Sequence, residues 1–268
     1  MTTASSRFGA HVSIQDLTKI YETRQGDDVL ALDRVSLEIE AGSFVAVVGP
    51  SGCGKSTLLS LLASLTNITE GQLMIDGEQV VRPHPKVGVV FQSDLLLSWR
   101  TVLDNVLLPI EIKHQSVQKN REKAISLLSQ VGLAGFENKF PSELSGGMRQ
   151  RVAICRALIQ APGLLLMDEP FGALDALTRE QMIMDLQTTW SRIGNTVLFI
   201  THGIDEAVFL ADRVIVMTPR PGRIDLDLKV EIDRPRNWAS VHSDVKFQQY
   251  VTQVRQIFEK RGVLKAGH

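Results

Sequence analysis

The sequence predicts an α/β fold in which buried strands alternate with helices, on the strength of three observations. Short apolar runs, long enough for buried strands, recur at residues 44–48, 87–91, 164–167 and 196–200. Between them lie longer segments in which apolar residues return every three or four positions, the period of a helix. Polar residues directly follow several of the runs, as expected where the strands of an open sheet end at a ligand-binding edge.

Length and composition are those of an ordinary globular chain. The 268 residues suit one or two domains, and hydrophobic residues make up 44% of them. The formal net charge is −1, so no general basic field favours nucleic acid, and we expect no nucleic-acid partner. Cys53 and Cys155 are too few for a disulfide framework or a zinc cage, and they fit a reducing, cytoplasmic setting.

We expect neither a secreted nor a membrane-spanning chain. Residues 1–7 lack the long apolar core of a signal peptide. No apolar run approaches the ~20 residues needed to cross a bilayer. If the protein works at a membrane, another chain is expected to supply the membrane part.

The region at residues 12–39 is expected to form short strands separated by turns. Its apolar segments lie at residues 12–14, 30–32 and 35–39, the last with the alternation of a half-buried strand.

A glycine-rich turn follows the run at residues 44–48 and precedes the helical pattern at residues 58–62. Its glycines let the backbone wrap closely around an anion, and the helix adds its positive N-terminal end. Lys55 can reach β- and γ-phosphates, and the Ser56 hydroxyl can ligate Mg²⁺. The order of strand, turn and helix predicts a nucleoside-triphosphate site rather than an accidental glycine-rich turn. The residues expected to hold the nucleotide are Gly49, Pro50, Ser51, Gly52, Cys53, Gly54, Lys55, Ser56 and Thr57.

Two residues near this turn carry predictions of their own. Cys53 lies at a helix N-terminus beside Lys55, conditions that lower a thiol pKa, so we expect a reactive thiol that bound nucleotide protects. Tyr21 lies upstream of the turn, where an aromatic ring could stack on an adenine. From the sequence alone, a half-buried strand tyrosine is the favoured alternative.

Four polar residues follow the apolar runs and are expected at one edge of the sheet. Gln92 can contact Mg²⁺ or orient a water molecule, and Asp168 is placed to hold Mg²⁺ through water. Glu169 can accept a proton from an attacking water, and His202 can contact a γ-phosphate. The ordinary alternatives are a surface amide, solvated carboxylates and a surface histidine. A phosphate site in the same chain favours the functional interpretation over these alternatives.

From about residue 99 to residue 161 the pattern becomes helical, with apolar periodicity at residues 101–110, 116–131 and 145–159. Ser145 is a good N-cap for the last of these helices, and Gly146 and Gly147 leave its backbone N–H groups bare. We therefore expect a second anion site there, although a Ser-Gly-Gly sequence alone commonly marks a loop.

The remaining elements complete the alternation. Residues 172–175 lead into a helix at about 176–193, and a short helix is expected at residues 205–211. A strand follows at residues 214–217 and an alternating strand at 224–232. The apolar stripe of a terminal helix is formed by Phe247, Tyr250, Val251, Val254, Ile257 and Phe258.

Together these motifs resemble the ATP-binding subunit of an ABC transporter. The resemblance covers about residues 12–232, and the motifs occur in the family's order. They look like the Walker A loop at residues 49–56, the Q-loop residue Gln92, the signature motif at 144–150, Walker B at 164–168, the catalytic glutamate Glu169, the D-loop at 172–175 and the switch histidine His202. The signature carries Met148 where many relatives have glutamine, a variant familiar among bacterial importers.

The resemblance implies a P-loop (RecA-like) nucleotide-binding core with an antiparallel β subdomain and an inserted α-helical subdomain. The ATPase domain would span residues 1–232, with the helical insert at about residues 93–161. Residues 233–268 would form a short C-terminal helical extension, which is too short for the regulatory domain of some sugar and methionine importers.

The resemblance also implies ATP and Mg²⁺ as cofactors, with Ser56, Gln92 and Asp168 holding the metal ion. Two copies, or two homologous ATPase subunits, would meet head to tail. The glycine-rich turn of one and the helix start at Ser145 of the other would then close on one ATP. The remaining nucleotide contacts implied by the resemblance are Tyr21, Ser145, Gly146, Gly147 and Asp175.

Residues 99–102, 205–213 and 219–224 look like one importer branch, the nitrate, sulfonate and taurine group, which also takes up thiamine-precursor pyrimidines. The resemblance implies that ATP hydrolysis powers import of such a solute through a separate membrane permease. The subunit would lie at the cytoplasmic face of the inner membrane, with a solute-binding protein as an indirect partner.

The loop at residues 94–99 is unusually apolar, so its side chains must be buried within the subunit or against another chain. The resemblance favours a cytoplasmic helix of the permease, with Trp99 as an aromatic anchor.

Two other functions compete with this interpretation. An ABC-type ATPase that acts on DNA or ribosomes without a permease would carry coiled-coil or basic insertions, and none is visible. A phosphotransferase of the adenylate-kinase kind would have no use for the signature motif.

Overall fold

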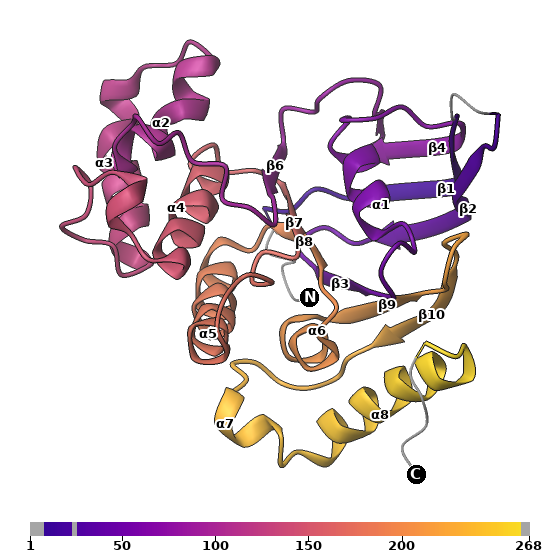
Figure 1. Ribbon diagram of the computed structural model, residues 1–268. Coiled ribbons are helices and arrows are strands. Elements are labelled where there is room, and N and C mark those ends of the chain that lie inside the picture. Colours follow the sequence, from indigo (N-terminus) through magenta and orange to yellow (C-terminus); the bar gives the residue numbers. More distant parts are fainter. Residues whose placement is uncertain (1–7, 23–25, 264–268) are drawn as a thin grey trace, which may run out of the picture.

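The computed structural model describes residues 8–22 and 26–263, which form two sheets and a block of helices beside them (Figure 1). Residues 1–7, 23–25 and 264–268 lie outside the described residues. The expectation about the N-terminal segment, and the two ends of the expected domain division, fall in these parts and stay predictions.

The larger sheet has the strand order β10-β9-β3-β8-β7-β6, and its strands run parallel except for β10, which pairs antiparallel with β9. Every residue of β3 and β8 is buried, which suits continuous apolar runs in parallel strands covered on both faces. The runs predicted as buried strands are strands, but the strand at residues 87–90 is mostly half-buried because it lies at the edge of the sheet. The bounds are β3 (Phe44–Val48), β6 (Val87–Val90), β7 (Leu164–Asp168), β8 (Thr196–Ile200), β9 (Arg213–Met217) and β10 (Ile224–Lys229).

Alternate residues of β3 face different cores, because successive side chains of a strand point to opposite faces. Phe44, Ala46 and Val48 belong to a core that includes side chains of α5, α6 and α8. Val45 and Val47 belong to a second core with α1 and the smaller sheet. The larger sheet thus lies between a helical layer and a mixed layer. These helices are α1 (Lys55–Leu62), α5 (Ala176–Ile193), α6 (Ile204–Leu210) and α8 (Val245–Lys260).

The smaller sheet is antiparallel and has the order β2-β1-β4-β5. The expectation of short strands and turns at residues 12–39 was wrong, because β1 and β2 are long strands paired along their length. Asp16 and Arg34, with φ of 46° and 47°, lie where the register shifts, so the chain bulges there and pairing resumes. The strands are β1 (Val12–Tyr21), β2 (Val29–Ile39), β4 (Glu70–Ile75) and β5 (Glu78–Gln79).

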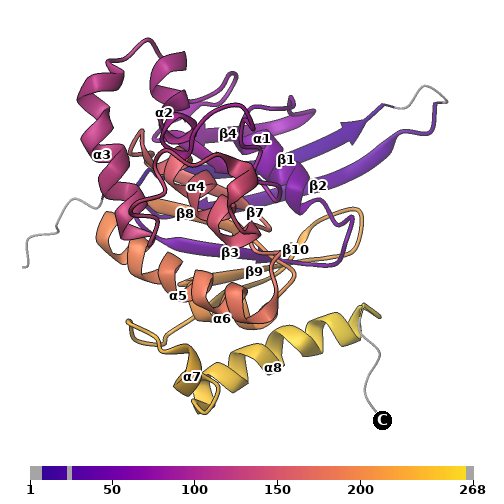
Figure 2. The ribbon, with the colours of Figure 1, turned by 60° about the vertical axis from the view of Figure 1, so that its left-hand side comes forward.

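The helical block lies to one side of the sheets and has an apolar core of its own (Figures 1 and 2). Its helices occur where periodicity predicted them. Thr101, Ser116 and Ser145 each cap a helix by accepting a hydrogen bond from the backbone N–H three residues later. The elements are α2 (Val102–Ile112), α3 (Val117–Gln130), the 3-10 turn η1 (Pro141–Glu143) and α4 (Gly146–Leu158).

The C-terminal segment packs on the helical layer, where α8 lies beside α6 (Figures 1 and 2). Phe247, Val251 and Phe258 from the predicted apolar stripe are buried in the same core as the larger sheet. The strand expected at residues 224–232 ends at Lys229, and α7 (Trp238–Val241) follows before α8. Within residues 8–22 and 26–263, no helix has both the length and the apolar content needed to cross a bilayer.

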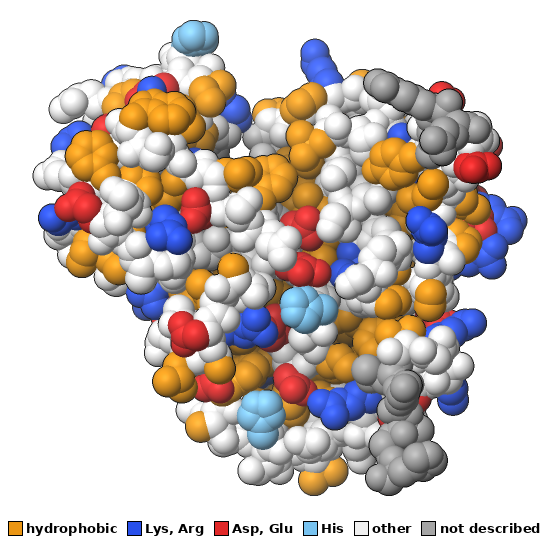
Figure 3. Space-filling model, in the orientation of Figure 1, with side chains coloured by type: hydrophobic (Ala, Val, Ile, Leu, Met, Phe, Trp, Pro, Cys, Tyr) orange, Lys and Arg blue, Asp and Glu red, His pale blue; other side chains and the backbone are white. Residues whose placement is uncertain are grey.

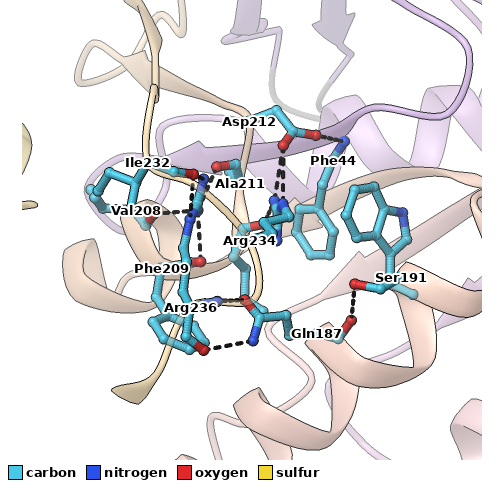
Figure 4. Close-up of polar contacts among 12 residues, drawn as sticks. Phe44, Gln187, Ser191, Val208, Phe209, Ala211, Asp212, Ile232, Arg234 and Arg236 are labelled. Carbon is cyan, nitrogen blue, oxygen red and sulfur yellow. Dashed lines mark hydrogen bonds and ion pairs between the residues drawn. The ribbon is translucent and has the colours of Figure 1, made fainter. Parts of the chain in front are cut away.

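Two arginines fasten this segment to the core (Figure 4). Arg234 donates from Nη2 to the Asp212 carboxylate at 3.0 Å, and Asp212 also accepts from the backbone N–H of Phe44 at 2.8 Å. Arg236 turns its guanidinium into the interior, where it donates to backbone carbonyls at the end of α6. These contacts join the chain beyond β10 to the helical layer and to the first residue of β3.

Candidate nucleotide site

The glycine-rich turn lies in the middle of the larger sheet, at the end of β3, with β9 on one side and β8 on the other. Its conformation needs glycine at two positions, because Gly52 and Gly54 have φ of 76° and 99°. A methyl group on Gly54 would also lie 2.6 Å from Leu32 Cδ2 and 2.9 Å from Ala31 O. Gly54 directly precedes α1, so the free N–H groups of that helix begin inside the turn.

Lys55 places its charge within the turn. Its side chain is nearly buried, with the residue 6% exposed, and its Nζ donates to Gly49 O at 2.8 Å and to Pro50 O at 3.1 Å. The ammonium group thus lies among backbone groups of the loop rather than in solvent. A cation, backbone N–H groups and a helix N-terminus converge here, which is the arrangement that binds phosphate.

A pocket of about 360 Å³ opens beside the turn. Tyr21 lines it from the end of β1, and Val29 and Ala31 line it from β2. Tyr21 is 38% exposed, and Lys19 Nζ lies 4.8 Å from the centroid of its ring. The lining residues are Tyr21, Val29, Ala31, Ser51, Gly52, Gly54, Lys55, Ser56, Thr57, Glu169 and Arg220.

Ser56 and Asp168 bring two oxygen donors together at the base of the turn. Ser56 Oγ donates to Asp168 Oδ1 at 3.1 Å, although 112 residues separate them in the chain. Burial raises the pKa of Asp168, and the neighbouring Glu169 adds to the rise against the opposing effects of Ser56 and Lys55. A hydroxyl and a carboxylate are hard oxygen ligands of the kind Mg²⁺ prefers, and a bound cation would favour the ionised carboxylate. The donor set therefore fits a magnesium ion.

Glu169 and His202 form the next pair along the same edge. His202 Nδ1 lies 3.2 Å from Glu169 Oε2. Glu169 has φ of 43°, an uncommon conformation for a non-glycine residue, and its backbone N–H donates to Ile200 O at 2.9 Å. The strand neighbour thus fixes the backbone of Glu169 beside the pocket, which Glu169 lines. In Figure 3, acidic and histidine side chains gather in the middle of the face shown.

Gln92 lies near Glu169, the first member of this pair. A methyl group on Gly172 would lie 3.4 Å from Gln92 Nε2 and 3.8 Å from Glu169 Oε2, so both side chains lie beside Gly172. The side chain of Gln92 is exposed at the end of β6, next to β7. The predicted sheet edge therefore holds Gln92, Asp168, Glu169 and His202 near one another.

The second predicted anion site lies elsewhere. Ser145, Gly146 and Gly147 start α4, and these three residues do not line the pocket in the described chain. A methyl group on Gly147 would lie 2.6 Å from Thr178 Cγ2, so the helix start faces the beginning of α5. Asp175 caps α5 by accepting from the Thr178 N–H at 3.1 Å, and its hydrogen bonds to Thr178 lower the pKa of its carboxyl. One copy of the chain does not bring these residues to the glycine-rich turn.

The expectation of a reactive Cys53 thiol was wrong. Cys53 is only 1% exposed, and its Sγ lies in the apolar core beneath the turn. Burial raises the pKa of this thiol, and the opposing effects of Lys55 and of backbone hydrogen bonds are smaller. The Cys53 backbone belongs to the turn, whereas its side chain faces away from the pocket.

A polar group behind His202 was missed from the sequence. Thr201 Oγ1 donates to Glu206 Oε2 at 2.6 Å, and Arg179 Nη2 donates to Gly172 O at 3.3 Å. Arg179 Nε lies 3.5 Å from Glu206 Oε1. Burial raises the pKa of Glu206, and the Thr201 hydrogen bond opposes the rise. The group joins the tip of β8 to the segment after β7, and Arg179 and Glu206 look like ordinary helix residues in the sequence.

Arg220 was also missed as a pocket residue. It lies in the loop between β9 and β10, where residues 219–224 contributed to the resemblance but to no site. An arginine between two prolines carries no sequence signal of its own, because only the fold brings that loop to the turn.

Comparison with known proteins agrees with this geometry. A family model described as "ABC transporter" matches residues 32–172. An aliphatic sulfonates import ATP-binding protein, SsuB, of Bacillus thuringiensis subsp. konkukian is 42% identical over 95% of this chain and 98% of its own length. A taurine import ATP-binding protein, TauB, of Rhizobium johnstonii is 43% identical over 95% of this chain and 99% of its own length.

A solved structure is similar over most of the chain. It is a dimeric, post-hydrolysis state of an ATP-binding cassette bound to ADP and Pi. The TM-score is 0.72 at 34% identity, and the match covers 83% of this chain and 100% of the other. The likeness confirms that the fold is that of an ATP-binding cassette.

Proposed function

The chain belongs to the ABC transporter family, and we propose that it is the ATP-hydrolysing subunit that powers import of a small solute through a separate membrane permease. The observation that carries the proposal is the edge of the larger sheet, where Lys55, Ser56 and Asp168 lie beside the pair of Glu169 and His202. The edge combines a phosphate cradle, oxygen donors for a cation and a carboxylate that can accept a proton.

We assign the nucleotide contacts from the pocket. Tyr21 would stack on the adenine at one end, and the turn at residues 49–57 would hold the phosphates. Mg²⁺, when bound, would neutralise charge on the phosphates, and Ser56, Asp168 and Gln92 are the groups we propose to hold it.

Hydrolysis would depend on Glu169 and His202. Glu169 would accept a proton from the attacking water, because it lines the pocket and its backbone is held there by β8. His202 would keep that carboxylate in place through the 3.2 Å contact and would reach the γ-phosphate. Gln92, which also lies beside Gly172, would orient the water.

A second copy of the chain, or a homologous ATPase subunit, would complete the site. The signature residues Ser145, Gly146 and Gly147 start a helix away from the pocket of their own chain, and Asp175 lies near them. In a head-to-tail dimer they would close over the nucleotide of the partner. The dimeric state of the similar cassette, with its ADP and Pi, supports this arrangement.

We propose import as the direction of transport on the basis of the relatives. SsuB and TauB carry import in their names, for aliphatic sulfonates and taurine respectively. We therefore propose a small organic solute of the nitrate, sulfonate, taurine or thiamine-precursor kind, delivered by a solute-binding protein. The subunit would bind the permease at the cytoplasmic face of the inner membrane, and no nucleic acid would take part.

The test is Glu169→Gln, an isosteric change that removes the proton acceptor. We expect turnover to fall by roughly 10²- to 10⁴-fold while ATP affinity stays within about twofold. With ATP and Mg²⁺ the variant should accumulate as a dimer in size-exclusion chromatography. Glu259→Gln, at an exposed position of α8, is the matched control. Near-normal turnover in the Glu169 variant would contradict the proposed mechanism.

A further inference from the structure

The loop between β9 and β10, residues 218–223, is pressed against the glycine-rich turn. Gly222 N donates to Ala31 O at 2.9 Å, and Asp33 N donates to Gly222 O at 3.0 Å, so the loop extends the edge of β2. A methyl group on Gly222 would lie 2.1 Å from Cys53 O. The backbone of this loop and the backbone of the turn are therefore in direct contact, and the loop cannot shift without disturbing the turn.

The loop is also fastened within itself. Thr218 Oγ1 donates to Pro221 O at 3.0 Å and accepts from the Arg223 N–H at 3.0 Å. The Arg223 side chain is committed to Asp33, since its Nε donates to Asp33 Oδ2 at 2.8 Å. This contact holds the pKa of Asp33 below its usual value, mainly through the hydrogen bond from Arg223. One arginine of the loop thus has a structural partner.

The other arginine is free. Arg220 is exposed and lines the pocket beside the turn. Among residues 8–22 and 26–263, no hydrogen bond or ion pair engages its guanidinium group. A fixed loop that directs an unpaired cation at a phosphate-binding pocket is preorganised for an anionic ligand.

The strand order says which part of the ligand Arg220 reaches. β9 lies on one side of β3, whereas β8 and β7, whose ends are followed by His202 and Glu169, lie on the other. Tyr21 pairs with Val29 across β1 and β2, on the side where the loop contacts Ala31. Arg220 is therefore on the nucleoside side of the pocket.

We propose that Arg220 binds the nucleotide at its nucleoside end, through oxygen atoms of the α-phosphate and ribose, and so sets the affinity for ATP and ADP alike. The inference rests on the proposed nucleotide pocket. A guanidinium group suits this role, because it is always charged and presents several N–H donors in a plane that matches phosphate. Arg220 would act on binding and not on hydrolysis, since Glu169 and His202 lie across the turn.

The experiment measures dissociation constants for Mg-ATP and Mg-ADP by calorimetry, in the Glu169→Gln background so that ATP survives. Arg220→Ala should weaken both nucleotides by the same factor, about 5- to 20-fold for a lost contact with a charged group at an exposed position. Arg220→Lys should recover part of the loss. In the otherwise wild-type chain, Arg220→Ala should raise KM and leave kcat within about twofold.

Matched variants separate the possible outcomes. Arg255→Ala, at an exposed position of α8, should change neither dissociation constant. Unchanged binding in Arg220→Ala, a loss for ATP alone, or a melting temperature that falls with the affinity would each overturn the inference. Lys55→Ala should abolish binding in the same assay. If the parent chain bound neither nucleotide, the proposed function itself would fail.

Discussion

Replacing Arg236 by alanine should destabilise the chain far from the nucleotide pocket. Arg236 is only 5% exposed, and its Nη1 donates to Val208 O at 2.9 Å, Phe209 O at 2.7 Å and Ala211 O at 2.9 Å. Its Nη2 donates to Ile232 O at 3.0 Å. The carbonyl groups at the end of α6 have no further helical turn to bond, so the guanidinium group takes the place of that turn (Figure 4).

The size of the effect follows from two opposing contributions. A buried acceptor left without a donor costs about 1–3 kcal/mol, and several carbonyl groups lose a donor together. Burial of the guanidinium charge is itself unfavourable, and it lowers the pKa of Arg236 to about 10. Removing the buried charge therefore offsets part of the cost of the lost hydrogen bonds. Water entering the space left by the side chain would satisfy some of the carbonyl groups. We therefore expect a net loss of about 3 kcal/mol, near the value for removing one partner of a buried ionic contact.

The assay is thermal unfolding of the nucleotide-free chain. For a chain of this size, about 3 kcal/mol corresponds to a fall in Tm of roughly 6–12 °C. Arg255→Ala, at an exposed position of α8, should stay within about 1 °C of wild type. Arg236→Lys should fall between the two, because it keeps the charge and loses the planar set of donors. A Tm within about 2 °C of wild type for Arg236→Ala would refute the reasoning.

Three further predictions concern the candidate site. Cys53 should react slowly with maleimide at neutral pH, with or without ATP, because burial raises its pKa and so depletes the thiolate; fast labelling of the native chain would contradict its orientation. His202→Ala should lower turnover by about tenfold or more and keep nucleotide binding, and a collapse of ATP affinity would make His202 structural. Tyr21→Ala should weaken ATP by about fivefold or more, and Tyr21→Trp should weaken it less, whereas equal losses would favour a role in the strand alone.

Sequence reasoning succeeded where the signal is local. Strand, glycine turn and helix follow one another at residues 44–62, and each has its own pattern, so their order could be read directly. The starts of α2, α3 and α4 were marked by capping hydroxyl groups that bond to the next turn. The polar residues after buried runs met at one edge because parallel strands end together.

Sequence reasoning failed where the outcome depends on contacts distant in the chain. Cys53 lies at a helix N-terminus, which lowers a thiol pKa. The core beneath the turn buries its sulfur, however, so the pKa is raised instead. Arg220 reaches the pocket only because β9 pairs beside β3. The stretch that contains Asp16 and Arg34 looks like turns because their backbone is turn-like, yet the neighbouring strands continue through both bulges.

The loop at residues 94–99 is held in place by the helical block. Arg149 Nε donates to Asp94 Oδ2 at 2.9 Å, and Arg156 Nη1 donates to Leu95 O at 2.7 Å. The Asn105 side chain accepts from Leu97 N at 2.8 Å and donates to Leu97 O at 3.1 Å. α4 thus holds the start of the loop, and α2 holds it at Leu97. It lies near the notch that separates the helical block from the sheets in the space-filling view (Figure 3).

The fixed loop leaves its largest side chain in solvent. Trp99 is 73% exposed, and Leu95 is also exposed, whereas Leu96 packs against the core of the helical block. The apolar side chains of this loop were expected to be buried within the subunit or against another chain. Packing within the subunit accounts for Leu96 but not for Trp99. A rigid loop that presents a tryptophan is the kind of anchor that dominates an interface, because little ordering is left to be done on binding.

We therefore predict that Trp99→Ala leaves the isolated subunit intact and weakens its assembly with the permease. The lost anchor should cost about 2 kcal/mol or more, equivalent to roughly a 30-fold weaker complex. Since the side chain is exposed, ATPase activity and Tm of the isolated subunit should stay close to wild type. The measurement is co-reconstitution with the permease, followed by solute uptake. Val245→Ala, an equally exposed apolar residue at the start of α8, should assemble normally. Unchanged assembly and uptake in the Trp99 variant would contradict the prediction, and the permease contact would then have to lie elsewhere on the subunit.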